Sequence, residues 1–227
     1  MEITRRRPMS EDLRARILEA VAREPAPTRT GVRRRTVLAL LLGAASMVTV
    51  FIAIGGVRLT DRPIGVVFAT ALGAIGLAFT ALILAVGRGS SMLGRRTSTL
   101  LWLIIAIPLL LFGWKLGVSA GCELSEWWPE RPGFRCLLWT LLMGAGLLAS
   151  LLYARRRTVT SRAALLGGAM GVAVGAAGWV LTDLWCPVGH AAHLAVGHLL
   201  PLIILGSLGA VVGHFVLPIR SDEGPRG

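Results

Sequence analysis

The sequence predicts an all-α, polytopic membrane protein, with six transmembrane helices in a bundle and a short N-terminal cytoplasmic amphipathic helix. Three observations predict this class. Of the 227 residues, 54% are hydrophobic, and the mean hydropathy of +0.69 is too high for an ordinary soluble domain. Glycine is frequent, with 28 residues, as expected where membrane helices approach closely. The net charge of +12 is carried almost wholly by arginine, which gathers at the ends of apolar segments and therefore reports topology.

Residues 1–36 form a polar, basic arm ahead of the first apolar run. Within it, Leu13, Ile17 and Val21 recur at helical spacing and give a narrow apolar stripe, and Pro25 ends the pattern. An isolated helix of about a dozen residues is marginal in water. We therefore expect this amphipathic helix to become ordered only against a partner or a lipid surface.

Six apolar stretches follow, each close to the ~20 residues that cross a bilayer. They are 37–57, 65–87, 99–118, 136–154, 163–183 and 194–217. In the fifth, Gly167, Gly171 and Gly175 lie four residues apart, which predicts a close helix contact. The resulting division is a cytoplasmic arm (1–36), a transmembrane sensor domain (37–217) and a cytoplasmic tail (218–227).

The arginines predict the orientation, because cytoplasmic segments carry an excess of basic residues. If the N-terminus is inside, the outer segments contain few of the 24 basic residues, namely Arg58, Arg62, Lys115, Arg131 and Arg135. Six spans then place both termini in the cytoplasm. Since the basic charge is explained by topology, we expect no direct contact with nucleic acid.

The end of the fifth span and the start of the sixth contain one cysteine and three of the four histidines: Cys186, His190, His193 and His198. These residues are candidate metal ligands, and zinc or copper suits the donor set, although the spacing matches structural zinc sites only loosely and no cofactor is certain. In a regular helix starting near Pro187, His190 and His193 share a face, and His198 lies one to two turns deeper. The alternative is that these histidines hold helices together by hydrogen bonds.

All three cysteines, Cys122, Cys136 and Cys186, fall at the predicted outer ends of spans, in an oxidising compartment. Three thiols allow at most one disulfide. Sensor or disulfide chemistry therefore stands beside the alternative that these cysteines pack as small apolar side chains.

Motifs of enzymes are absent from the sequence: it has no His-Glu-x-x-His, no phosphate-binding glycine loop, no Gly-x-Ser-x-Gly and no Cys-x-x-Cys. We expect a protein that is not an enzyme. Lys115 and Asp183 lie near span ends, where their side chains are expected to reach toward water, and this leaves no charge at mid-bilayer for ion transport.

Several segments together suggest a family. They are Ser10 to Leu18 in the arm, Arg135-Cys136 at the fourth span, and Cys186-Pro187 followed by His190, His193, Gly197-His198 and Pro201. In these segments the chain resembles the NrsF-like six-span membrane anti-sigma factors, to which the CarR-like regulators of myxobacteria are similar. The resemblance covers nearly the whole chain.

The resemblance implies that the arm holds an extracytoplasmic-function sigma factor inactive at the bacterial inner membrane. It also implies that outward-facing cysteines at Cys136 and Cys186 act as sensor thiols for metal or oxidative stress, whereas Cys122 has no counterpart. The partners would be a sigma factor and the lipid bilayer. The residues expected to contact the sigma factor are Leu13, Arg14, Ile17, Leu18 and Val21.

Two other functions remain open from the sequence. The first is a membrane metal-binding or transport protein that uses the cluster from Cys186 to His198, with the basic arm serving only as a topology signal. The second is an arm that lies flat on anionic lipid, although its apolar stripe is too narrow for strong insertion.

Overall fold

The computed structural model describes most of the apolar part of the chain. The described residues are 29–57, 63–86, 96–119, 133–156 and 162–217, together with Asp12 and Glu19. The chain divides into two units, residues 1–35 and 36–227, and each is considered by itself. The predicted amphipathic helix of the arm, the segment with Cys122 and the tail from residue 218 lie outside the described residues.

All secondary structure in the described ranges is helical. The elements are α2 (Arg29–Ala53), α3 (Ile64–Val86), α4 (Thr97–Ser119), α5 (Phe134–Arg155), α6 (Ala163–Trp185), α7 (Ala191–Leu194), the π-helical segment η1 (Ala195–Leu199) and α8 (Leu200–Val216). The last three form one continuous span, Ala191–Val216. Among the described residues, six helices are thus long and apolar enough to cross a membrane, with mean hydropathies from 1.8 to 2.3, which confirms the predicted all-α class with six apolar spans.

The first and last spans begin earlier than predicted, and α2 ends at Ala53 rather than at the predicted residue 57. The first span was predicted from residue 37, but α2 begins at Arg29. Arginine is a good helix former, so the arginines of 33–35 extend the helix although they are not apolar. The last span was predicted from residue 194, but α7 begins at Ala191, where the side chain of His190 caps the helix.

The surface of the spans is apolar over their length. Leu42, Phe79, Trp102 and Phe215, from four different spans, each expose between 64% and 69% of their area. A helix that is apolar on its exposed face as well as on its buried face is suited to hydrocarbon rather than to water. The packing therefore supports a multi-pass membrane protein.

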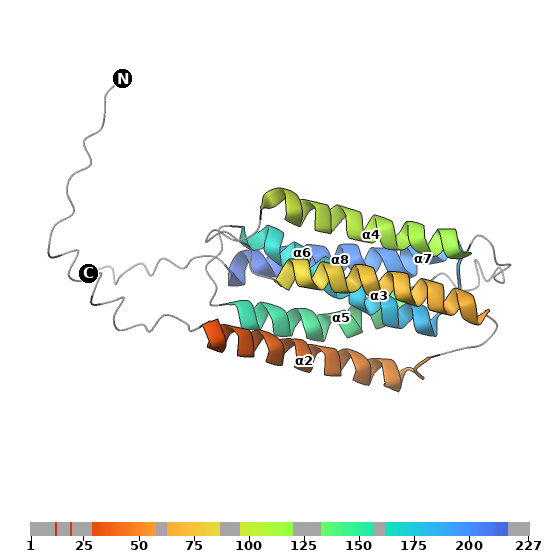
Figure 1. Ribbon diagram of the computed structural model, residues 1–227, viewed down its shortest axis with the longest axis horizontal. Coiled ribbons are helices and arrows are strands. Elements are labelled where there is room, and N and C mark those ends of the chain that lie inside the picture. Colours follow the sequence, from red (N-terminus) through yellow and green to blue (C-terminus); the bar gives the residue numbers. More distant parts are fainter. Residues whose placement is uncertain are drawn as a thin grey trace, which may run out of the picture. The chain divides into compact units, whose positions relative to one another are not determined.

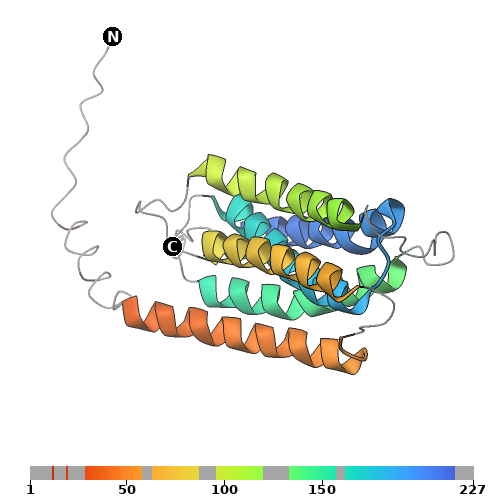
Figure 2. The same ribbon diagram turned by 45° about the vertical axis from the view of Figure 1, so that its right-hand side comes forward.

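Consecutive spans run in opposite directions, and α6 packs against α3, α4, α5 and α8 (Figures 1 and 2). Polar contacts join several of these helices. The hydroxyls of Thr140 in α5 and Thr182 in α6 lie 2.8 Å apart, and Trp114 Nε1 in α4 donates to the Ala69 carbonyl of α3 at 3.2 Å. Such hydrogen bonds are a usual source of helix association in lipid.

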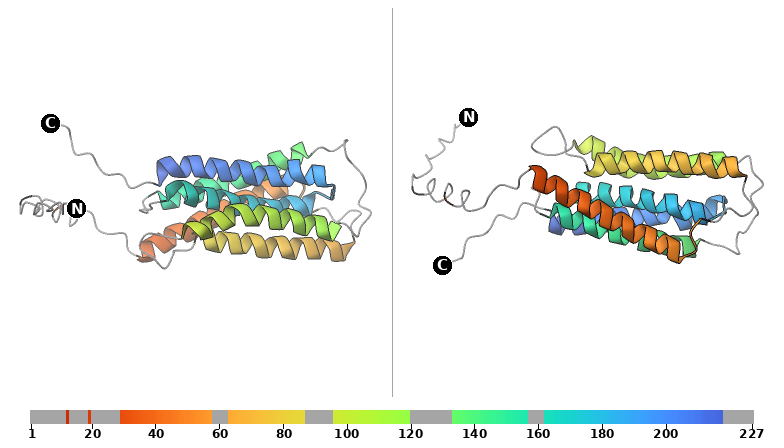
Figure 3. Two further views of the ribbon diagram at one scale, coloured as in Figure 1. Left: turned by 90° about the horizontal axis from the view of Figure 1, so that it is seen from above. Right: turned by 60° about the horizontal axis from the view of Figure 1, so that its bottom comes forward.

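The closest helix contact is between α6 and α8, which lie side by side in both views of Figure 3. A Cβ atom at Gly171 would lie 2.6 Å from the Leu205 carbonyl carbon and 2.9 Å from Gly206 Cα, so only glycine allows this approach. Gly167 meets the backbone of Gly209 in the same way. This confirms the close contact that the glycine spacing predicted.

Candidate metal and thiol site

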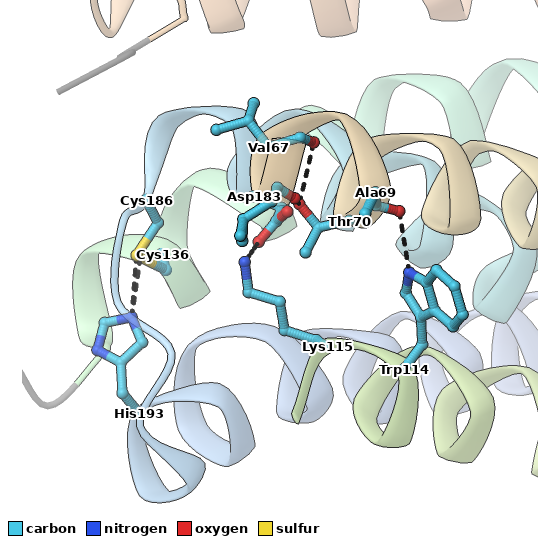
Figure 4. A network of polar contacts seen from close by, with 10 residues as sticks. Val67, Ala69, Thr70, Trp114, Lys115, Cys136, Asp183, Cys186 and His193 are labelled. Carbon is cyan, nitrogen blue, oxygen red and sulfur yellow. Dashed lines mark hydrogen bonds and ion pairs between the residues drawn. The ribbon is translucent and has the colours of Figure 1, made fainter. Parts of the chain in front are cut away.

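Four buried side chains converge at the end of the bundle where α6 ends and α5 begins. Cys136 lies in the first turn of α5, Cys186 directly follows α6, His193 belongs to α7 and His198 to η1. Their sulfur and nitrogen atoms all lie within 4.8 Å of one another. Each of the four residues is at most 3% exposed. Figure 4 shows Cys136, Cys186 and His193 from this group.

The imidazole of His193 joins the two cysteines. Its Nε2 atom lies 3.5 Å from Cys136 Sγ and 3.2 Å from Cys186 Sγ, and both cysteines are free thiols. The ring of His198 lies 5.8 Å from that of His193 and contacts the edge of Trp179, with ring centroids 5.2 Å apart. Neither ring nitrogen of His198 has a hydrogen-bond partner among the described residues.

Pro187 determines where Cys186 lies. A residue before proline is disfavoured in the α conformation, and Cys186 has φ −97° and ψ 117°, which is extended. Helix α6 therefore ends at Trp185, and the chain turns toward α7. The next helix is started by His190, whose Nδ1 accepts the Ala192 N–H at 3.3 Å.

The π segment brings the two histidines together. In an α-helix, residues five apart lie about 140° apart around the axis. Segment η1 (Ala195–Leu199) has hydrogen bonds between residues five apart, so His193 and His198 come to the same side. Pro201 contributes, because it has no N–H to bond with the carbonyl of Gly197. Segments of this kind are frequent at functional sites.

Two glycines let α5 approach η1. Gly133, just before α5, has φ 95°, a conformation that favours glycine. A Cβ atom on it would lie 2.9 Å from both the His193 carbonyl oxygen and the Gly197 nitrogen. A Cβ atom on Gly197 would lie 3.0 Å from the Cβ atom of Cys136. The position of Cys136 beside the histidines therefore depends on both glycines.

The residue types of the group are ones that can form thiolates and bind metal ions. Cys186 lies between the last two spans. Hydrogen bonds to its sulfur, first from the Cys136 thiol and then from His193, lower the pKa of Cys186 well below its usual value, against the desolvation that burial imposes. The thiolate is the form of cysteine that reacts and that binds metal. The buried group of two thiols and two imidazoles could hold a metal ion.

A buried ion pair lies at the same end of the bundle (Figure 4). Lys115 Nζ of α4 is 2.5 Å from Asp183 Oδ1 of α6, and the two side chains are 2% and 3% exposed. The sequence-based expectation that both side chains reach toward water is wrong. Two opposite charges on two apolar spans are the signal that could have indicated the pair, because an isolated charge in that environment is costly.

The structure brings together three of the four predicted metal ligands, Cys186, His193 and His198, and adds Cys136, which was predicted only as a sensor thiol. His190 is exposed and caps α7 instead of joining the group. The contact between Cys136 and the histidines is tertiary, so no spacing in the sequence indicates it. The residues expected to bind a sigma factor lie outside the described part of the chain.

The fold and the site define a class: an α-helical, multi-pass membrane protein with a buried thiol and imidazole cluster at one end of its helix bundle. Comparison with family models then gives the family. The model described as Negative regulator of sigma F (NrsF) matches residues 21–218, and the chain belongs to this family. Comparisons with curated proteins and with solved structures found no match.

Membership has two direct consequences. The chain is an anti-sigma factor, a regulator of transcription rather than an enzyme, and its partner is a sigma factor. The matched residues include every described span, from α2 to α8. The family match therefore extends over all the described membrane helices.

Proposed function

We propose that this protein sequesters an extracytoplasmic-function sigma factor at the bacterial inner membrane and releases it on an external metal or oxidative signal. The family match over residues 21–218 carries the proposal, because it establishes a negative regulator of a sigma factor. With six spans, both termini of such a molecule lie on one side of the membrane, and only loops face the other side. A signal and a response on opposite sides are the natural use of that arrangement.

The proposed topology has both termini in the cytoplasm. The spans alternate in direction, so the start of α4 and the end of α5 lie on the same side. Basic residues mark both positions, with Arg96 at the first and Arg155 and Arg156 at the second. The thiol and imidazole group is at the opposite ends of the helices and would then face the cell exterior. In this division, 1–36 is the sigma-binding arm, 37–217 the sensor and 218–227 the tail.

The arm has the chemistry of a helix that folds on its partner. Leu13, Ile17 and Val21 can enter an apolar groove, while the arginines beside them meet acidic side chains at its rim. Because the helix is marginal alone, part of the interaction free energy is used to order it. A modest change at the membrane is then sufficient to shift the balance between bound and released sigma factor.

The arm prediction concerns these anchors. Replacing Leu13, Ile17 and Val21 together by alanine in the full-length protein should weaken sigma binding by at least about tenfold, because buried apolar anchors dominate such interfaces. Binding of the cognate sigma factor would be measured in detergent by fluorescence anisotropy. Glu11→Gln, on the other face of the predicted helix, is the control. Unchanged affinity in the triple variant would contradict this role of the arm.

The sensor prediction concerns the thiols. Changing Cys136 and Cys186 together to serine should abolish the release of sigma factor by metal or oxidant while leaving basal sigma binding intact, because serine cannot form a thiolate. The measurement is a sigma-dependent reporter in cells, with and without the stress. Cys122→Ser is the matched control. A normal response in the double variant would remove the cysteines from the mechanism.

A second function is favoured by one observation, the buried ligand cluster. A membrane metal-binding or transport protein would use Cys186, His193 and His198 as zinc or copper ligands. Two measurements distinguish this function from the first. If the peptide 1–36 fails to retain a sigma factor while the purified spans bind metal stoichiometrically, sigma binding by the arm is excluded.

A further inference from the structure

We propose that Cys136, Cys186, His193 and His198 form a tetrahedral zinc site. Two thiolates and two imidazoles are a usual donor set of structural Zn²⁺, and tetrahedral coordination by two sulfurs and two nitrogens is typical of zinc. All four side chains present their ligand atoms within 4.8 Å of one another. The inference rests on the second proposed function and deepens it, because it names the ion and adds Cys136 as a ligand. Zinc binding requires neither the arm nor a sigma factor, so its failure and a failure of sigma binding are distinguishable.

The distances agree with a single ion between the ligands. With Zn–S of about 2.3 Å and Zn–N of about 2.0–2.1 Å, tetrahedral angles separate a sulfur and a nitrogen ligand by about 3.5 Å. The two measured separations, from His193 Nε2 to Cys136 Sγ and to Cys186 Sγ, are 3.5 Å and 3.2 Å. The ligand atoms of the whole group lie within 4.8 Å of one another, so some side chains would move inward by about 1 Å to reach a common ion.

His198 provides independent support. Its side chain is fully buried, and both ring nitrogens lack a hydrogen-bond partner in the described ranges. An unsatisfied buried polar group is costly and requires a reason. Coordination would satisfy one nitrogen, and the edge contact with Trp179 fixes the plane of the ring.

The local charges also favour a divalent ion. The carboxylate of Asp183, three residues before Cys186, is already paired with Lys115. Two thiolates alone would leave two buried negative charges without compensation, which is strongly unfavourable. Zn²⁺ balances them, so the group becomes neutral.

The site would join three parts of the fold. Cys136 comes from the start of α5, Cys186 from the end of α6, and the histidines from the α7 and η1 part of the last span. Regular α-helix in place of η1 would move His198 away from the other ligands. The π segment would therefore place the fourth ligand, His198, beside the other three.

The test uses full-length protein in detergent, purified under reducing conditions with an affinity tag that contains no histidine. Zinc per chain is measured by inductively coupled plasma mass spectrometry, and Co²⁺ replaces zinc as a spectroscopic probe. We expect roughly one zinc per chain and the intense visible bands of tetrahedral cobalt, with thiolate-to-cobalt charge transfer in the near ultraviolet. An octahedral cobalt spectrum, or no zinc in the folded protein, overturns the proposal.

Variants assign the ligands. His198→Ala should weaken zinc binding by more than about 100-fold, because even the loss of an outer hydrogen-bond partner costs 10–100-fold. His198→Cys should retain one ion and strengthen the charge-transfer band, since it supplies a third thiolate. His190→Ala and Cys122→Ser are controls that should bind zinc normally, because His190 is exposed outside the group and Cys122 is not one of the four ligands.

Folding is checked in the same samples. A zinc chelator should lower the unfolding temperature of the unmodified protein and leave that of helical His198→Ala unchanged, because ligand binding stabilises only the folded state. Equal zinc loading of His198→Ala and the unmodified protein overturns the assignment. So does loss of zinc in His190→Ala.

Discussion

Replacing Lys115 by methionine is expected to lower the free energy of unfolding by about 3–5 kcal/mol. Lys115 Nζ lies 2.5 Å from Asp183 Oδ1, and both side chains are almost fully buried. Methionine has a similar length but no charge, so the buried carboxylate of Asp183 loses its ion-pair partner. The measurement is reversible unfolding in mixed detergent micelles, followed by circular dichroism.

The control for this prediction removes both charges. In Lys115→Met/Asp183→Leu, neither charge of the pair remains, and stability should return to within about 1 kcal/mol of the unmodified protein or exceed it, because apolar replacements of buried ion pairs are often neutral or stabilising. If the single variant is as stable as the double variant, the ion pair has no structural role. Asp183 is three residues from Cys186, so zinc content should be measured in both variants.

Replacing Gly171 by alanine is expected to destabilise the bundle by about 1–3 kcal/mol, which is the usual cost of an added methyl group in a well-packed core. The new Cβ atom would lie 2.6 Å from the Leu205 carbonyl carbon. Backbone atoms cannot move aside as a flexible side chain does, so α6 and α8 must separate. Loss of helix content on heating in detergent measures the effect.

Gly76→Ala is the matched control for Gly171→Ala. Gly76 lies in α3, and a Cβ atom there meets nothing within 4 Å. Alanine is the better helix former by about 1 kcal/mol, so this variant should be neutral or slightly more stable. Equal effects of the two substitutions would show that helix propensity, and not the contact between α6 and α8, determines the outcome.

The spans could be predicted because their signal is local. A run of about 20 apolar residues has few structures open to it in a membrane other than a helix. The bounds were harder to predict where the helix continues through charged residues, as α2 does from Arg29. Hydropathy reports where the lipid begins, whereas backbone hydrogen bonds decide where a helix begins.

The ligand cluster could be predicted only in part. Cys186, His193 and His198 are close in sequence, and a local window is enough to select them. Selection of Cys136 over His190 requires the approach of α5 to η1, which depends on the backbones of Gly133 and Gly197. The depth of His198 was also expected from regular helix geometry, and the π segment alters that geometry.

The central position of α6 has a consequence for how a chemical change at Cys186 spreads. Cys186 is joined directly to a helix that packs against α3, α4, α5 and α8 at once. Densely packed interfaces do not deform continuously, so rotation or translation of α6 requires four contacts to exchange together. Intermediate positions are then costly, and the bundle is expected to pass between a small number of discrete arrangements. A graded stimulus would therefore appear in each molecule as an all-or-none step.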